Sequence, residues 1–361
     1  KAPYLVLESQ SQAFTGWLPY PGQLRLMALS HLASGARGIM VWPWASIHGG
    51  IESYWKGVLS HDGEPGETFA EMKQIGRDLK RIAAEMTDEP KKNRIALIVS
   101  VEALHALRWF PTEQGQSYND VVNVFHRALY ELNLECDILY DREENWTAYD
   151  LLIFPQLYCC GDDMIRRVRA FVENGGSVVA SFRSFFADEN LKIRHDRQPH
   201  GLTDVFGMHY SRFTRDEAGG WMELLEADMA ETLAYYPHRY WRNYASGTYH
   251  PLGKGHAWYL GTMLPIEDLK RLLLRACEKA GIPAPTLRWP TIHKQTGGLH
   301  FLFNYSAESQ TLVCPVDGVE LLSDVSVRKG ETMTLSDWGA AAIKCTSSKE
   351  LRGIILRRAS F

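Results

Sequence analysis

The feature that most constrains the fold is an alternation of apolar strands and helices in the first 86 residues. Pro3–Glu8 (PYLVLE) and Gly38–Trp42 (GIMVW) are near-continuous apolar runs, which are typical of strands buried on both faces. Helices are predicted at Gly22–Ala33, which Gly35 ends, and at Glu67–Met86. Strands that alternate with helices form parallel sheets, whose functional groups gather at the carboxyl ends of the strands.

A second α/β region follows the polar segment Thr87–Asn93, which is predicted to be a linker. Apolar runs and amphipathic segments alternate again in this region. Strands are predicted at Ile95–Val99, Cys136–Leu139, Leu151–Phe154, Ser177–Ala180 and His256–Leu260, and helices at Asn119–Leu132, Asp162–Asn174 and Glu267–Ala280.

From Leu287 onward the pattern changes to short alternating runs separated by turns, which predicts a small antiparallel β domain. Its clearest strands are His300–Asn304, Gln310–Val313 and Val319–Leu322.

Composition excludes several classes of partner. A formal charge of -4 and a pI near 6.4 argue against a nucleic-acid partner. The sequence holds no apolar run long enough for a transmembrane helix, so we expect no membrane partner. The six cysteines form no regular framework, and no signal peptide is visible. We therefore expect buried thiols in a reducing, cytoplasmic compartment.

Acidic and aromatic side chains gather where the two N-terminal strands end. Glu8 ends the first strand, Trp42 and Trp44 end the second, and Glu52 follows in the next loop. Glycoside cleavage needs a carboxylate to attack or stabilise an oxocarbenium-like centre, and indole planes hold a sugar ring. These residues therefore predict a sugar site at one edge of the sheet.

The order of motifs here resembles glycoside hydrolase family 42, the β-galactosidases. Several motifs in order over about sixty residues are far more specific than any one of them. The matching segments are Leu7-Glu8, Trp17-Leu18-Pro19-Tyr20, Pro21-Gly22, Ala33-Ser34-Gly35-Ala36, Trp42-Pro43-Trp44, Gly49-Gly50-Ile51-Glu52 and Ser60-His61-Asp62-Gly63.

The resemblance continues to about residue 283, through Val168–Val179, Asp188-Glu189-Asn190, Leu202–Gly207 and Gly253-Lys254-Gly255. It implies three domains in an α/β chain. Residues 1–88 would be the C-terminal part of a TIM-barrel, an incomplete (β/α)8 segment. Residues 89–283 would be a flavodoxin-like domain, related to class I glutamine amidotransferases, that mediates trimerisation. Residues 284–361 would form a small β-sandwich.

The resemblance also implies roles for single residues. Glu8 corresponds to the catalytic nucleophile, and Trp17, Trp42 and Glu52 correspond to residues lining the galactose pocket. The sequence departs from the family at two places near that pocket. Trp55 replaces a histidine, and Pro43 and Ala45 replace arginines beside Trp44. We expect Trp44 and Trp55 to contact substrate as well, and we expect no cofactor and no metal.

Retaining hydrolysis needs a second carboxyl group, and the family places it on an earlier barrel strand. We therefore expect an oligosaccharide-cleaving homotrimer in which a missing N-terminal barrel segment or chain supplies the acid/base. The alternative is a non-catalytic scaffold for oligomerisation or sugar binding. A weaker alternative is an amidotransferase-like enzyme that uses Cys159 or Cys160, although no glycine precedes the two cysteines.

Overall fold

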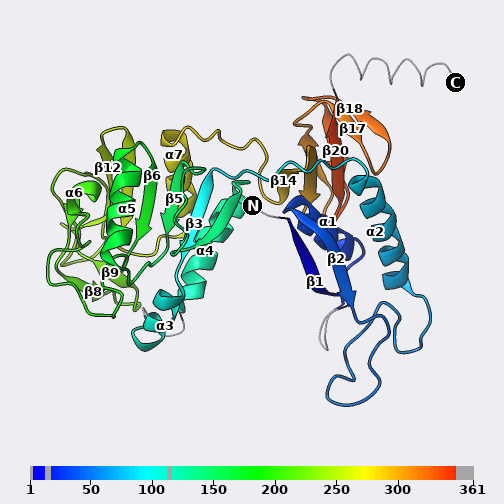
Figure 1. Cartoon of the computed structure of the whole chain (residues 1–361), viewed down its shortest axis with the longest axis horizontal. Coiled ribbons are helices and arrows are strands. Elements are labelled where there is room, and N and C mark those ends of the chain that lie inside the picture. The colour runs from blue at the N-terminus through cyan, green and yellow to red at the C-terminus, as the bar shows by residue number, and fades with distance from the viewer. Residues whose placement is uncertain (1–2, 13–17, 112–115, 347–361) are drawn as a thin grey trace. The chain divides into compact units, whose positions relative to one another are not determined.

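The computed structural model describes residues 3–12, 18–111 and 116–346. The chain divides into two compact units (Figure 1). One unit combines residues 1–92 with 286–361, and the other comprises residues 93–285. The domain limits at residues 88 and 283, and a separate C-terminal domain, stay predictions.

The first unit opens with the predicted strand–helix alternation. Strands β1 (Tyr4–Gln10) and β2 (Ala36–Trp42) pair in parallel, and helix α1 (Gln23–Ala33) connects them. Helix α2 (Glu67–Ala83) packs on α1 through Leu24, Ala28 and Ile75. The prediction of a parallel pair is therefore confirmed.

The C-terminal part of the same unit is a small antiparallel β structure that packs on α1 and its flanks. The Lys294 ammonium lies 2.9 Å from the Ser34 hydroxyl, and Tyr20 stacks on Trp338 with ring centroids 6.5 Å apart. Five strands form one sheet in the order β14 (Thr291–Thr296), β15 (Leu299–Asn304), β20 (Ala340–Cys345), β17 (Gly318–Glu320) and β18 (Val325–Val327), and β16 (Gln310–Val313) pairs with β19 (Thr332–Leu335).

The second unit is built on one seven-stranded mixed sheet. The last five strands of its order are parallel, and β11 and β12 are antiparallel to their neighbours. The order is β11 (Glu231–Tyr235), β12 (Ala245–Leu252), β13 (Gly255–Leu260), β6 (Ser177–Ser181), β5 (Leu151–Phe154), β3 (Ile95–Val99) and β4 (Cys136–Tyr140). Two short pairs, β7 (Met208–His209) with β10 (Glu226–Ala227) and β8 (Phe213–Arg215) with β9 (Trp221–Glu223), lie outside this sheet.

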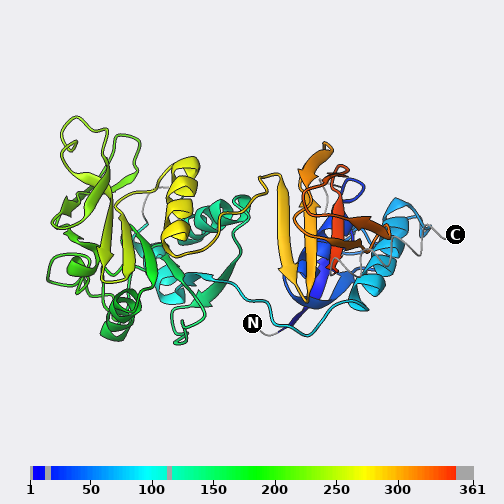
Figure 2. The ribbon, with the colours of Figure 1, turned by 90° about the horizontal axis from the view of Figure 1, so that it is seen from above.

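Helices cover both faces of the seven-stranded sheet. One buried cluster contains residues of α3 (Val101–Trp109), α5 (Asp162–Glu173) and α6 (Thr203–Phe206). The other contains residues of α4 (Tyr118–Glu131) and α7 (Ile266–Lys279). Figure 2 shows α5 and α7 on opposite sides of the sheet. This three-layer α/β arrangement explains why the strands read as continuous apolar runs.

Candidate active site

Glu8 lies on β1, close to the carboxyl end of the strand. The register of the β1–β2 ladder shifts twice, between Tyr4 and Leu5 and between Val6 and Ser9, so Glu8 falls within the second irregularity of the pairing. Such bulges turn a side chain away from its regular direction. The Glu8 side chain is exposed.

The chain just after Glu8 anchors the long loop that follows β2. The Ser11 hydroxyl, fully buried, lies 3.3 Å from the Pro43 carbonyl and 3.1 Å from the Lys56 carbonyl. The Gln12 amide donates to the Gly57 carbonyl at 2.7 Å. Because these bonds reach both ends of the loop, they fix it beside the end of β1.

The loop itself folds back so that residues 43–46 lie beside 57–59. Ser46 is the central link, since its hydroxyl donates to the Leu59 carbonyl at 2.9 Å and accepts from the Gly57 amide at 2.9 Å. Gly57 is required at this crossing. A Cβ there would lie 2.6 Å from the Ala45 carbonyl carbon and 2.7 Å from the Trp44 oxygen. Both are backbone atoms, which cannot move aside cheaply.

The folded loop brings Trp42 and Trp55 together. Their ring centroids are 4.9 Å apart and their planes are at 87°, the edge-to-face geometry that aromatic pairs favour. The Trp55 amide bonds the Glu52 carbonyl at 2.9 Å, so one turn carries both residues. Trp42 is 38% exposed, which leaves an indole surface available beside the end of the strand.

The remaining predicted site residues are less closely linked to this pair. Trp44 makes an edge contact with Phe69 near the start of α2, with centroids 6.1 Å apart. Its role in substrate binding stays a prediction. Trp17 lies outside the described residues.

Residues that hold the loop were not identified from the sequence. Ser11, Gln12 and Ser46 are polar residues that are buried, and only their contacts show their importance. His61, which belongs to the matching segment Ser60–Gly63, also holds the loop, since its Nε2 lies 2.7 Å from the Ser53 carbonyl. In the sequence, the lone Gly57 between Lys56 and Val58 is the feature that could have indicated a close backbone approach in this loop.

The two vicinal cysteines of the second unit lack the properties of a nucleophile. Cys159 and Cys160 are 2% and 7% exposed. Burial raises the pKa of each thiol to about 12, so both are protonated at neutral pH. A reactive cysteine needs the opposite environment, which argues against the amidotransferase alternative.

A buried carboxyl group lies in the second unit, at the end of β9. Glu223 is completely buried and accepts hydrogen bonds from the Arg183 amide at 2.7 Å, the Trp221 indole at 3.2 Å and the Tyr259 hydroxyl at 3.1 Å. Burial raises its pKa to about 7, although the hydrogen bonds lower it. Arg183 has a φ of 61°, a strained conformation that the Glu223 bond helps to hold.

The described ranges hold no group of three or more His, Cys, Asp or Glu residues arranged to bind a metal ion. No helix of these ranges is both long and apolar enough to cross a membrane.

Comparison with known families gives two matches that together span most of the chain. A family described as "Beta-galactosidase trimerisation domain" matches residues 93–283. A family described as "Beta-galactosidase" matches residues 1–82. The matches place the chain among the relatives of β-galactosidases.

Individual relatives agree with this class. The chain is 24% identical to the β-galactosidase BgaA of Clostridium cellulovorans, over 95% of the chain and 56% of that protein. It is 28% identical to the β-galactosidase BgaP of a Planococcus species, over 83% of the chain and 49% of that protein. The chain belongs to glycoside hydrolase family 42. It spans about half the length of these curated relatives.

Solved structures share the fold. The β-galactosidase of Bacillus circulans sp. alkalophilus superposes with a TM-score of 0.86 at 23% identity, covering 95% of this chain and 55% of that one. The β-galactosidase of the haloarchaeon Halorubrum lacusprofundi gives a TM-score of 0.84 at 21% identity, over 95% and 53%. The α/β class predicted from the sequence is therefore confirmed.

Proposed function

We propose that this chain is the C-terminal portion of a retaining glycoside hydrolase that cleaves terminal β-galactosides or similar oligosaccharides. The observation that carries the proposal is the family match over residues 1–82, which includes Glu8. Glu8 is the nucleophile in this account. Its exposed position near the carboxyl end of a parallel strand fits that role, because barrel enzymes carry catalytic groups there.

The surroundings of Glu8 supply the other parts of a sugar site. Trp42, held by Trp55, offers an aromatic face for the apolar C–H groups of a pyranose. Glu52 lies on the turn that carries Trp55 and accepts hydrogen bonds from sugar hydroxyls. An ionised acceptor makes such bonds about twice as strong as a neutral one.

The mechanism is a double displacement. The Glu8 carboxylate attacks the anomeric carbon and forms a covalent glycosyl ester while the leaving oxygen takes a proton from a second carboxyl group. That second group then removes a proton from water as the water attacks the anomeric carbon of the ester. The ester bond breaks, and the sugar and the Glu8 carboxylate are released. The two carboxyl groups must lie about 5 Å apart.

We assign the second carboxyl group to sequence outside these residues. The relatives are about twice as long as the part that this chain matches. A two-stranded piece of a barrel leaves an apolar sheet surface uncovered, and the described β1–β2 pair exposes Leu7 to 70%. A longer polypeptide, or a second chain, would cover this surface and complete the site.

Residues 93–283 serve as the trimerisation domain of the assembly in this proposal. The support is the family match for this region. The region is also a compact unit with one buried cluster on each face of its sheet.

The test is hydrolysis of a chromogenic β-galactoside by the natural polypeptide purified from its source. We expect Glu8→Gln to lower kcat by at least a thousandfold, since the amide cannot form the glycosyl ester. Glu67→Gln, at the exposed start of α2, is the matched control and should leave kcat unchanged. An active Glu8→Gln variant would remove Glu8 as the nucleophile. A wild-type protein with no glycosidase activity would favour the non-catalytic scaffold.

A further inference from the structure

The two lateral ends of the seven-stranded sheet in the 93–285 unit carry opposite charge. Strand β4 forms one end and β11 the other, and both strands run in the same direction. The segments that follow them, 141–144 and 236–244, therefore emerge at the same edge of the sheet. Six strand spacings of about 4.8 Å separate them, or about 29 Å.

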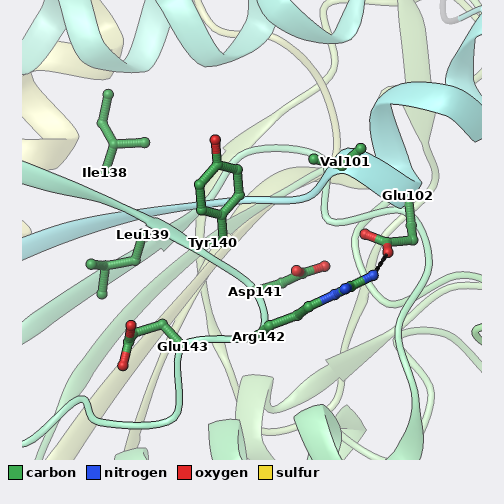
Figure 3. A pocket seen from close by; sticks show the side chains of 8 residues that line it. All are labelled: Val101, Glu102, Ile138, Leu139, Tyr140, Asp141, Arg142 and Glu143. Carbon is green, nitrogen blue, oxygen red and sulfur yellow. Dashed lines mark hydrogen bonds and ion pairs between the residues drawn. The ribbon is translucent and has the colours of Figure 1, made fainter.

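The β4 end holds an acidic pocket (Figure 3). Its volume is about 590 Å³. Ile138 and Tyr140 contribute apolar surface and are 54% and 64% exposed, unusual values for large apolar side chains on a strand. The charged lining residues are Glu102, Asp141, Arg142 and Glu143, and a Glu102–Arg142 ion pair closes one side.

The β11 end carries arginine and aromatic side chains. The segment 232–266 contains no Asp or Glu. Tyr235 and Tyr240 are 59% and 69% exposed, and the Arg239 guanidinium lies 5.4 Å from the Tyr240 ring centroid. Within the described ranges, Arg239 and Arg242 form no ion pair. His238 holds the turn, since its Nδ1 accepts from the Tyr240 and Trp241 amides at 3.1 and 3.2 Å.

We propose that the β4 pocket of one copy of this chain receives the 235–242 segment of a second copy. The inference rests on the trimer proposed above and names its interface. A ring of three copies needs a heterologous contact, in which two different patches of the same chain meet. These two patches are opposite in charge, lie at opposite ends of one sheet, and expose Tyr and Arg, the residues enriched at interface centres.

Charge complementarity favours a copy of this chain over another occupant. The pocket lining has three carboxylates and one guanidinium, so its preferred partner is cationic. The 235–242 segment presents two arginines beside exposed tyrosine rings. Each copy would then use both of its patches, and the ring closes without leaving either one exposed.

The test is the molar mass of the natural full-length polypeptide and its variants by light scattering across a dilution series. We expect three times the mass of one subunit for the wild type. We expect Arg239→Glu to raise the dissociation constant between copies at least tenfold. Lys254→Glu, an equal charge reversal at an exposed turn of the same unit, should leave the constant unchanged. Adding Glu143→Arg to Arg239→Glu should restore the trimer, which rules out misfolding as the cause.

The outcomes separate the interface from the trimer. A wild-type trimer that neither Arg239→Glu nor Glu143→Arg weakens would overturn this interface and leave the proposed trimer intact. A wild type that keeps the mass of a single subunit at every concentration would overturn the trimer, and the interface with it.

Discussion

Each of the two units contains parallel strands with apolar runs, but these strands differ in burial. In the 93–285 unit, strand β5 has all four of its residues fully buried between two helical layers. In the other unit, β1 and β2 also contain apolar runs, yet Leu5, Leu7 and Met40 are 60%, 70% and 60% exposed. An apolar run indicates that both faces of a strand are buried in the native protein. It does not indicate whether the elements that bury the strand belong to the same chain. The exposed face therefore supports a larger barrel as its natural context.

The largest expected effect comes from matched Leu→Ala substitutions in the two sheets. Leu152 on β5 is fully buried, so Leu152→Ala should destabilise the chain by about 2–5 kcal/mol through lost contacts and a cavity. Leu7→Ala should cost about 0.5 kcal/mol or less, because that side chain is 70% exposed. Urea unfolding of the isolated chain measures both. Equal losses would mean that the β1 face is already covered in solution.

The next largest expected effect is a pH dependence of stability that a buried carboxyl group causes and an exposed one does not. Burial raises the pKa of Glu223 from 4.5 to about 7, so the folded chain holds this proton more tightly than the unfolded chain. The bound proton stabilises the folded chain by on the order of 3 kcal/mol below pH 4.5. This stabilisation is lost as the pH rises through 7.

Glu223→Gln should remove this part of the pH dependence, since the amide oxygen keeps an acceptor for Arg183 and does not titrate. Urea midpoints between pH 4.5 and 8 measure it, and Glu226→Gln, at an exposed position nearby, is the control. A Glu223→Gln variant with the slope of the wild type would show that Glu223 is not the titrating group.

The smallest expected effect concerns the loop that carries Trp55. Gly57→Ala forces the Ala45 backbone to move, which should cost about 1–3 kcal/mol locally and separate Trp42 from Trp55. Gly49→Ala is the control, because a Cβ there meets nothing within 4 Å. Near-ultraviolet circular dichroism reports the tryptophan pair. An unchanged spectrum in Gly57→Ala would contradict the described loop packing.

Much of the fold follows from periodicity in the sequence. The strand Ile95–Val99 and the helix from Asp162 were predicted close to their observed limits, because both are strongly patterned. Helix α3 was missed because it is short and begins at Val101, with only the N-cap Ser100 between it and a buried strand. Strands β11 and β12 were missed because small, polar and aromatic residues alternate without a clear apolar face.

The candidate site was only partly predictable. Glu8 and Trp42 could be chosen because strand ends carry function in such folds. The contact of Trp55 with Trp42 depends on the loop conformation that the Ser11 and Ser46 hydrogen bonds hold. The bond from Ser11 to Lys56 spans 45 positions in the sequence, and the bond between Ser46 and Gly57 spans 11. Nothing in the local sequence encodes such contacts.

The most direct test of the account is to trap the glycosyl ester. The natural polypeptide would be treated with a 2-deoxy-2-fluoro-β-galactoside bearing a good leaving group, and the labelled peptide would be located by mass spectrometry. The account predicts one fluorogalactosyl group per subunit, attached to Glu8. Labelling of another carboxylate, or turnover of β-galactosides without any covalent label, would contradict it.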